Sequence, residues 1–239
     1  MNVIPVLDLR DGIVVRARMG ERDRYQPMAS PLSRSSDAVD VMRGLLSVHA
    51  FETFYVADLD AIAGSGDNEH VLRRLRAEFP AVEFWVDNGT ADRPSADRWL
   101  DAGLGHLVVG SESQSDIALV RDMSGRDRIV LSLDFRGDAF QGPAALLDEV
   151  ASWPRRLIVM TLARVGSAAG PDFDRLSAIR SIAGGREIYA AGGVRDRADL
   201  AALERAGISG ALVATSLHDG RLTGRDLAAL GPAKRRPAG

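Results

Sequence analysis

The sequence predicts a single α/β domain, a (β/α)8 TIM barrel made of two similar halves. Three observations support this fold: eight short strand-like segments, a helix-like segment after each of them, and an internal repeat. The chain of 239 residues is 46% hydrophobic and 26% charged, which is the composition of an ordinary globular domain. A chain of this length can bury one large core.

The strand-like segments are hydrophobic along nearly their whole length and do not alternate between polar and apolar residues. Strands that are buried on both faces of a parallel sheet have this pattern. The eight segments are residues 2–7, 53–57, 82–86, 105–109, 128–133, 156–160, 187–191 and 210–214. The helix-like segments are residues 37–50, 69–79, 95–104, 116–123, 144–153, 173–183, 197–207 and 224–230. Eight alternations favour a closed barrel, and a doubly wound open sheet is the main alternative.

The second half of the chain repeats motifs of the first half. The segment VIPVLDLRDG resembles VLSLDFRGDA, and three further pairs follow in the same order: DLDAIAGSGD with TLARVGSAAG, VDNGTADR with AAGGVRDR, and AGLGHLVVGSES with AGISGALVATSL. The aspartates of the first pair are 126 residues apart and the other pairs 103 or 104, which places about 22 additional residues after the first strand. We therefore expect one domain of residues 1–230, with half-barrels of about 1–125 and 126–230 and a flexible tail of 231–239.

The repeat places an aspartate, Asp8 or Asp134, at the carboxyl end of the first and the fifth predicted strand. These strands lie on opposite sides of a closed barrel, and the carboxyl ends of the strands form the catalytic face of such barrels. Two carboxylates that face one pocket can act as general base and general acid if their surroundings separate their pKa values. A structural alternative is that both aspartates cap the turns that follow them.

Small residues follow the seventh and eighth predicted strands, where many barrels of this kind bind phosphate. They are Gly192, Gly193, Thr215 and Ser216. Glycine lets backbone N–H groups approach an anion and hydroxyl groups can donate to it, although a glycine pair is also an ordinary turn. The equivalent corner of the first half contains the further candidates Asn88, Gly89, Gly110 and Ser111. Asp87 beside them would repel a dianion, so we expect weak phosphate binding or none at that second corner.

Composition and missing motifs exclude several classes of function. A net charge of −3 gives no indication of nucleic-acid binding, and no run of 18 apolar residues exists that would predict a membrane span. The chain has no cysteine and no signal-peptide pattern, so we expect a cytoplasmic protein. It has no close spacing of metal ligands and no nucleotide-binding glycine motif, so we expect neither a metal nor a cofactor. The oligomeric state stays open.

The motifs resemble those of the barrel family of histidine biosynthesis, which contains ProFAR isomerase and the cyclase of imidazole glycerol phosphate synthase. The resemblance covers nearly the whole chain and is carried by VLDLRDGIVVR, FYVADLDAIAGSGDN, IVLSLDFRG and AAGGVRD. It implies a phosphorylated small-molecule substrate and an Amadori-type isomerisation without a cofactor. In that reaction Asp8, Asp134 and Thr161 match the catalytic residues of the family.

Two loops depart from the pattern of ProFAR isomerase. Asp87-Asn88 stands where the isomerase has a glycine-rich phosphate loop, and the loop around Arg164 lacks the acidic residue that is a candidate general acid in the isomerase. Arg164 and Asp58 are further candidate substrate contacts, or they bridge to each other structurally. The departures resemble a divergent group of isomerase relatives from methanogens and methylotrophs.

The resemblance to this divergent group implies acid–base chemistry on a phosphorylated sugar or ribosyl-amine-like substrate, with a reaction other than the ordinary histidine-pathway step. The lineages of the group suggest a role near one-carbon cofactor biosynthesis. Two alternatives remain open at this point. The chain is either an ordinary ProFAR isomerase, or an inactive barrel that binds a phosphate ligand as a regulatory subunit.

Overall fold

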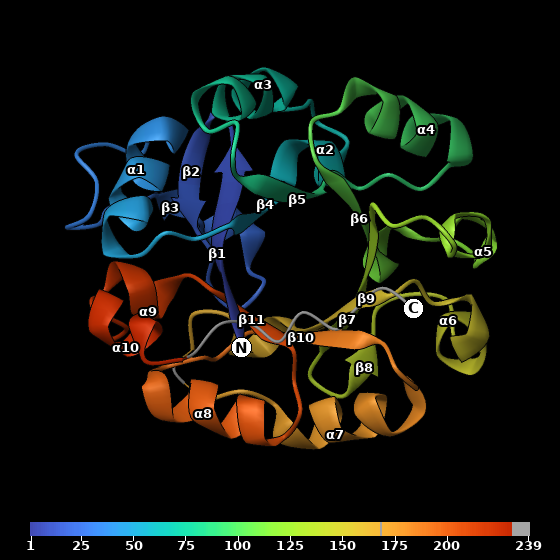
Figure 1. The fold of residues 1–239 in the computed structure, drawn as a ribbon. Helices are drawn as coiled ribbons and strands as arrows, with labels where there is room; N and C mark the ends of the chain where they lie inside the picture. Colours follow the sequence, from blue (N-terminus) through green and yellow to red (C-terminus); the bar gives the residue numbers. More distant parts are fainter. Residues whose placement is uncertain (168, 231–239) are drawn as a thin grey trace.

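The computed structural model describes residues 1–167 and 169–230, and the predicted flexible tail, residues 231–239, lies outside them. Eight parallel strands form a closed barrel inside a ring of helices (Figure 1). The strands are β1 (Asn2–Arg10), β4 (Thr53–Asp58), β5 (Glu83–Asp87), β6 (His106–Gly110), β7 (Ile129–Arg136), β9 (Arg156–Thr161), β10 (Glu187–Ala191) and β11 (Gly210–Val213). The barrel closes where Asn2 pairs with Gly210. The predicted TIM barrel is therefore confirmed, and the open sheet is excluded.

The outer helices lie close to the predicted segments. They are α1 (Ala38–Val48), α3 (Glu69–Glu78), α4 (Arg93–Ala102), α5 (Ala118–Met123), α6 (Ala145–Asp148), α7 (Phe173–Ile182), α8 (Arg197–Arg205) and α10 (Gly224–Ala228). Helix α6 ends early, and the 3-10 turn η3 (Val150–Ser152) follows it. The sequence pattern does not predict two short helices, α2 (Leu59–Ala63) and α9 (Thr215–His218), which follow β4 and β11 at the carboxyl end of the barrel.

Large side chains fill the interior of the barrel below its carboxyl end. Ile4, Ile158, Trp85 and Tyr189 belong to this inner cluster. The rings of Trp85 and Tyr189 meet edge to face with 4.8 Å between their centroids, although the residues lie on different strands, β5 and β10. A second, larger cluster packs between the outer face of the sheet and the helices. The inner cluster closes the barrel from below, so a ligand pocket can form at the carboxyl end.

Both halves contain the same hairpin after their first strand. Strand β1 continues past Asp8 and pairs antiparallel with β2 (Ile13–Arg16). In the same way β7 continues past Asp134 and pairs with β8 (Ala139–Phe140). The turns contain residues in the left-handed region, with φ of 79° at Gly12 and 58° at Gly137. The aspartates therefore lie within paired strands and do not cap the turns.

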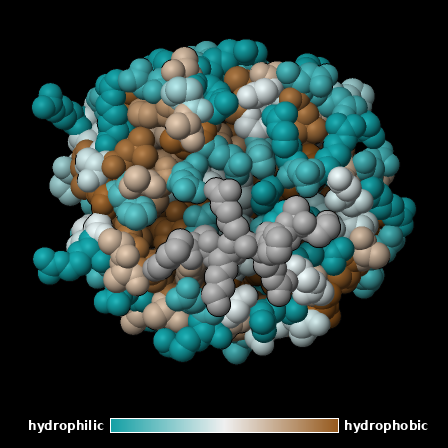
Figure 2. All heavy atoms as spheres, in the orientation of Figure 1, coloured by the Kyte–Doolittle hydropathy of each residue, from teal (hydrophilic) through white to brown (hydrophobic). Residues whose placement is uncertain are grey.

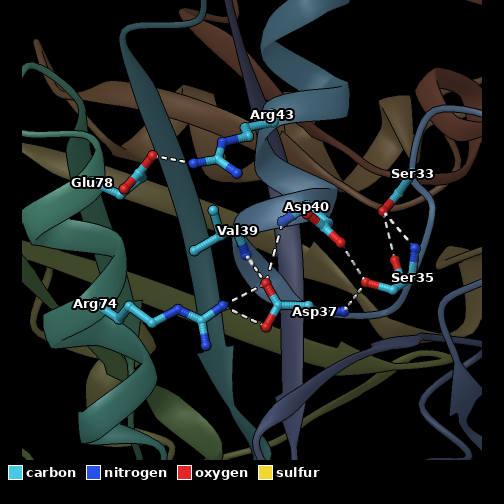
Figure 3. A network of polar contacts seen from close by, with 8 residues as sticks. All are labelled: Ser33, Ser35, Asp37, Val39, Asp40, Arg43, Arg74 and Glu78. Atoms are coloured by element: carbon cyan, nitrogen blue, oxygen red, sulfur yellow. Dashed lines mark hydrogen bonds and ion pairs between the residues drawn. The ribbon is translucent and has the colours of Figure 1, made fainter.

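The additional residues of the first half form loop 1 (residues 17–37), which contains the 3-10 turn η1 (Arg22–Arg24) and the short strand β3 (Gln26–Pro27). Loop 1 ends at Asp37, which caps helix α1 by accepting hydrogen bonds from the backbone N–H groups of Val39 at 3.0 Å and Asp40 at 3.3 Å. The same carboxylate pairs with Arg74 of α3 (Figure 3). The end of loop 1 is thus fixed to a neighbouring helix.

The face of the molecule seen in Figure 2 is largely hydrophilic, with hydrophobic residues in separate patches. Among the described residues, the exposed large hydrophobic side chains are those of Met19, Phe173 and Ile182. No helix within residues 1–167 and 169–230 has the length and apolar character needed to cross a bilayer.

The backbone around Gly193 predicts that this position accepts no side chain. A Cβ there would lie 2.2 Å from the carbonyl oxygen of Gly170, and the φ of 87° is unfavourable for any other residue. We expect Gly193→Ala to lower the free energy of unfolding by about 2 kcal/mol or more. Gly185→Ala is the matched control, because a Cβ at Gly185 meets no atom within 4 Å. Urea unfolding followed by circular dichroism measures both, and equal stability of the two variants would contradict the described backbone.

Candidate active site

A pocket lies at the carboxyl end of the barrel, between the strand ends and loop 1. Of the two predicted catalytic carboxylates, Asp8 comes from β1 and Asp134 from β7, and both line it. Strand β7 is the fifth parallel strand of the closed barrel, so the two carboxylates approach the pocket from opposite sides. This is the arrangement that the repeat predicts.

The Asp134 carboxylate is held by donors from two neighbouring segments. Ser132 donates to its Oδ1 from a hydroxyl at 2.6 Å. Ser111 donates to Oδ2 at 3.1 Å, and the backbone N–H of Glu112 donates to the same oxygen at 3.3 Å. These residues belong to β7 and to the 3-10 turn η2 (Ser111–Ser113) after β6. Asp8, in contrast, accepts no side-chain hydrogen bond within the described part of the chain, so its carboxylate is free to meet a ligand.

Two further carboxylates line the same pocket, those of Asp87 and Glu112. Burial raises the pKa of Asp8 and that of Asp134 to about 7, and the positive charge of Arg22 partly opposes the change at Asp8. Burial also raises the pKa of Asp87, to about 6. Three carboxyl groups of the pocket therefore titrate near neutral pH, which is where general acids and bases work best.

Loop 1 brings a cation into this acidic pocket. The guanidinium of Arg22 forms an ion pair with Glu112, and Arg10 donates to the backbone oxygen of Arg22 at 2.8 Å. Sequence reasoning missed both Arg22 and Glu112. The available signal for Arg22 was the long insertion after the first strand, whose position in the repeat places it over the carboxyl end of the barrel. The signal for Glu112 was its place beside Ser111 in the repeated segment AGLGHLVVGSES.

The corner between the ends of β10 and β11 is open to the pocket. Gly192, Gly193 and Thr215 line the pocket there, as the sequence predicts. Within the described residues, the backbone N–H groups of Gly193, Val194, Thr215 and Ser216 have no hydrogen-bond partner. The Ser216 hydroxyl is buried and donates to the backbone oxygen of Val194 at 3.0 Å, so it holds the corner together. Free N–H groups and the Thr215 hydroxyl make this corner suitable for an anion.

The equivalent corner between β5 and β6 is closed by its own hydrogen bonds. The Gln114 amide donates to the backbone oxygens of Thr90 at 3.0 Å and Gly110 at 3.3 Å. The Asn88 side chain accepts from the Thr90 hydroxyl at 2.7 Å, and the Gly89 N–H donates to Asp87 at 3.2 Å. The four candidate contacts Asn88, Gly89, Gly110 and Ser111 are outside the pocket wall. The backbone N–H groups of Gly89, Thr90 and Glu112 at this corner are therefore already used.

Two other candidates serve the frame of the barrel. Asp58 is 2% exposed, caps α2, and accepts from the backbone N–H and the side-chain amide of Asn68, both at 2.7 Å. Arg164 donates to the backbone oxygens of Gly170 and Pro171, both at 3.0 Å, and so forms no bridge to Asp58. Both side chains are outside the pocket wall.

Thr161, a predicted catalytic residue, lies outside the pocket wall. It ends β9 as a buried residue next to Met160, which does line the pocket. His218 is 1% exposed and lines the pocket, although no motif indicates it. Its Nδ1 lies 2.9 Å from the Ser30 hydroxyl, and burial lowers its pKa to about 4. His218 belongs to helix α9, which the sequence pattern does not predict.

Metal-ligating side chains do not gather in the described residues. Within 1–167 and 169–230, no group of three or more His, Asp or Glu side chains is arranged to hold a metal ion.

Comparisons with known proteins show the family of the chain. The sequence pattern of the family described as "Histidine biosynthesis protein" matches residues 2–223. The chain is 30% identical to the uncharacterised protein MJ0703 of Methanocaldococcus jannaschii, over 93% of this chain and 95% of the relative. It is 31% and 32% identical to phosphoribosyl imidazole-carboxamide isomerases (ProFAR isomerases) of Stenotrophomonas maltophilia and Deinococcus radiodurans, over 92% of this chain and 95% of each relative. The chain therefore belongs to the histidine biosynthesis protein family.

Proposed function

We propose that the protein is an isomerase-type enzyme that acts by acid–base catalysis on a small molecule with one phosphate group. One observation supports the proposal above others: Asp8 and Asp134, both with a pKa near 7, share a pocket with an open anion corner. A carboxyl group with a pKa near the working pH can take a proton in one step and return it in the next. Isomerisation needs both transfers.

The phosphate anchors the substrate at the corner between β10 and β11. The free backbone N–H groups there and the Thr215 hydroxyl donate to the phosphate oxygens. Binding energy at this remote group holds the reacting carbon between Asp8 and Asp134, which turns an intermolecular proton transfer into a positioned one. The side chain of Arg22 adds positive charge near Asp8. This charge favours a substrate that carries further negative charge at that point.

The closed corner argues for a substrate with a single phosphate. The names of the ProFAR isomerase relatives describe a substrate with two phosphoribosyl groups. In this chain the backbone N–H groups of Gly89, Thr90 and Glu112 at the second corner are bonded internally, and Asp87 and Glu112 add negative charge beside it. Two like charges about 4 Å apart repel by about 4 kcal/mol at an effective dielectric constant of 20. A second phosphate therefore has no anchor.

An ordinary ProFAR isomerase is the second candidate. It is supported by the sequence identity of 31% and 32% with enzymes of that name over most of the chain.

The expected role near one-carbon cofactor biosynthesis depends on the family resemblance alone. The proposed substrate class is accordingly defined by its phosphate and its acid–base chemistry. An inactive phosphate-binding subunit would need no carboxyl groups that titrate near neutral pH.

Phosphate binding distinguishes the two corners. We expect inorganic phosphate and ribose 5-phosphate to raise the melting temperature of the protein, and Thr215→Val to weaken this effect by about tenfold in concentration, because one donor to the anion is lost. Asn88→Ala at the closed corner is the matched control and should leave phosphate binding unchanged. Thermal shift and titration calorimetry measure both. If Asn88→Ala weakens binding as much as Thr215→Val, the single-phosphate proposal fails.

The histidine-pathway reaction separates the two candidate enzymes. We expect the protein to support little or no growth of a bacterial strain without ProFAR isomerase on medium without histidine, since only one phosphate of that substrate finds an anchor. A bacterial ProFAR isomerase expressed at the same level is the positive control. Robust growth with this protein would instead establish the ordinary isomerase.

The raised pKa of Asp134 makes a prediction about stability that needs no substrate. Between about pH 4 and pH 7 the folded carboxyl group keeps its proton while the unfolded one loses it, so stability falls as the pH rises. Asp134→Asn removes this penalty and should stabilise the fold by on the order of 2 kcal/mol at pH 8, with a smaller gain at pH 5. Urea unfolding at both pH values measures the difference.

Activity should move in the opposite direction from stability. With a substrate in hand, Asp134→Asn and Asp8→Asn should each lower turnover by about a factor of 10² to 10⁴, the usual contribution of a general acid or base. Exposed Asp138→Asn is the control and should keep full activity. Near-normal turnover in both pocket variants would refute the catalytic role of the two aspartates.

A further inference from the structure

Asp87 lies in the pocket wall close to Asp134, although the chemistry above uses only Asp8 and Asp134. It is the last residue of β5 and is 5% exposed. The corner that it occupies binds no phosphate in the proposed function. Its carboxyl group is therefore available for another task in the same pocket.

A glycine brings the carboxyl groups of Asp87 and Asp134 together. A Cβ at Gly110 would lie 2.9 Å from Oδ2 of Asp87 and 3.6 Å from Oδ2 of Asp134. Both oxygens thus lie near the position that a Cβ at Gly110 would occupy, and glycine has no side chain that could separate them there. Two carboxylates that are close together in a buried site resist ionising at the same time.

The groups around the two carboxyls leave this repulsion largely in place. The Tyr55 hydroxyl donates to Oδ2 of Asp87 at 3.4 Å, and the Gly89 N–H donates to Oδ1. Glu112 adds negative charge at both aspartates, while Arg22, one of the arginines that line the pocket, is paired with Glu112. Burial is the main cause that raises the pKa of each carboxyl group.

We propose that Asp87 and Asp134 form a coupled carboxyl pair that keeps one proton at neutral pH and so supplies the acid that the loop after β9 lacks. The catalytic part of this inference rests on the proposed function, whereas the pairing itself is a property of the free protein. On the opposite side of the pocket, Asp8 acts as the base.

Proton transfer balances over a complete isomerisation of a phosphorylated ribosyl-amine-like substrate. The pair gives its proton to the ring oxygen as the bond between this oxygen and the nitrogen-bearing carbon breaks, and the nitrogen lone pair forms a C=N double bond to that carbon. Asp8 then takes the proton from the neighbouring carbon, which gives an enamine, and returns this proton to the nitrogen-bearing carbon. The hydroxyl group on the neighbouring carbon becomes the carbonyl and gives its proton back to the pair, so the pair and Asp8 both end in their starting states.

Carboxyl titration by NMR on protein labelled with ¹³C at aspartate tests the pair without a substrate. We expect Asp87→Asn to lower the pKa of Asp134 by about 1 or more, and Asp134→Asn to lower that of Asp87 similarly, because each variant removes the neighbouring negative charge. Asp8→Asn is the matched control: it removes a carboxyl group from the same pocket but not one beside Gly110, and should shift both titrations much less.

Three outcomes decide the question. Reciprocal shifts, with a small effect of Asp8→Asn, establish the pair. An unchanged Asp134 titration in a folded Asp87→Asn variant, verified by its melting temperature and amide spectrum, overturns it. Equal shifts from Asp8→Asn and Asp87→Asn also overturn it, because the coupling would then belong to the whole pocket. Failure of phosphate binding with the reciprocal shifts intact would remove the proposed function and leave the pair.

Discussion

The pairing of β1 with β11 is the interaction on which the site depends. This pairing closes the sheet and thereby fixes β1 and β7 on opposite sides of one interior. Trp85 and Tyr189 fill the middle of that interior, so the pocket has an apolar floor and is open at the carboxyl end. The removal of water by this closed wall is what raises the pKa of Asp8 and Asp134. In an open sheet the same aspartates would be hydrated, and their pKa would lie near the ordinary value for aspartic acid.

The two halves of the barrel share a backbone plan and differ in their chemistry. Each half has an aspartate in its first strand and a hairpin after it. The corner of the second half keeps Gly192 and Gly193 and free backbone donors, whereas the corner of the first half has Asp87 and an internal hydrogen-bond network. In the proposed function the second half therefore supplies the anion corner, and Asp87 of the first half joins Asp134 of the second half in the carboxyl pair. A fold with two similar halves thus has an asymmetric pocket at its strand ends.

The sequence predicts the parts of the site that depend on the regular barrel. The strands are continuous hydrophobic runs, and the repeat alone brings Asp8 and Asp134 to the same pocket. Arg22 could not be predicted, because loop 1 reaches the pocket through tertiary contacts such as the hydrogen bond from the Met19 N–H to the Val165 oxygen at 2.8 Å. Asp58 shows the opposite case. It was a candidate for the pocket, but the short helix after it takes its carboxylate as a cap.

The hairpins after Asp8 and Asp134 have a consequence for how such a barrel changes its substrate. Asp8 lies in register with Val15 on one side and Ala57 on the other, so its backbone is held by two neighbouring strands. The residues that line the pocket come largely from loop 1 and the strand-end turns. These segments can lengthen, shorten or be exchanged while the spacing of Asp8 and Asp134 stays constant. Natural selection, or a protein engineer who grafts a new segment over residues 17–37, can therefore alter the pocket wall without moving the two aspartates.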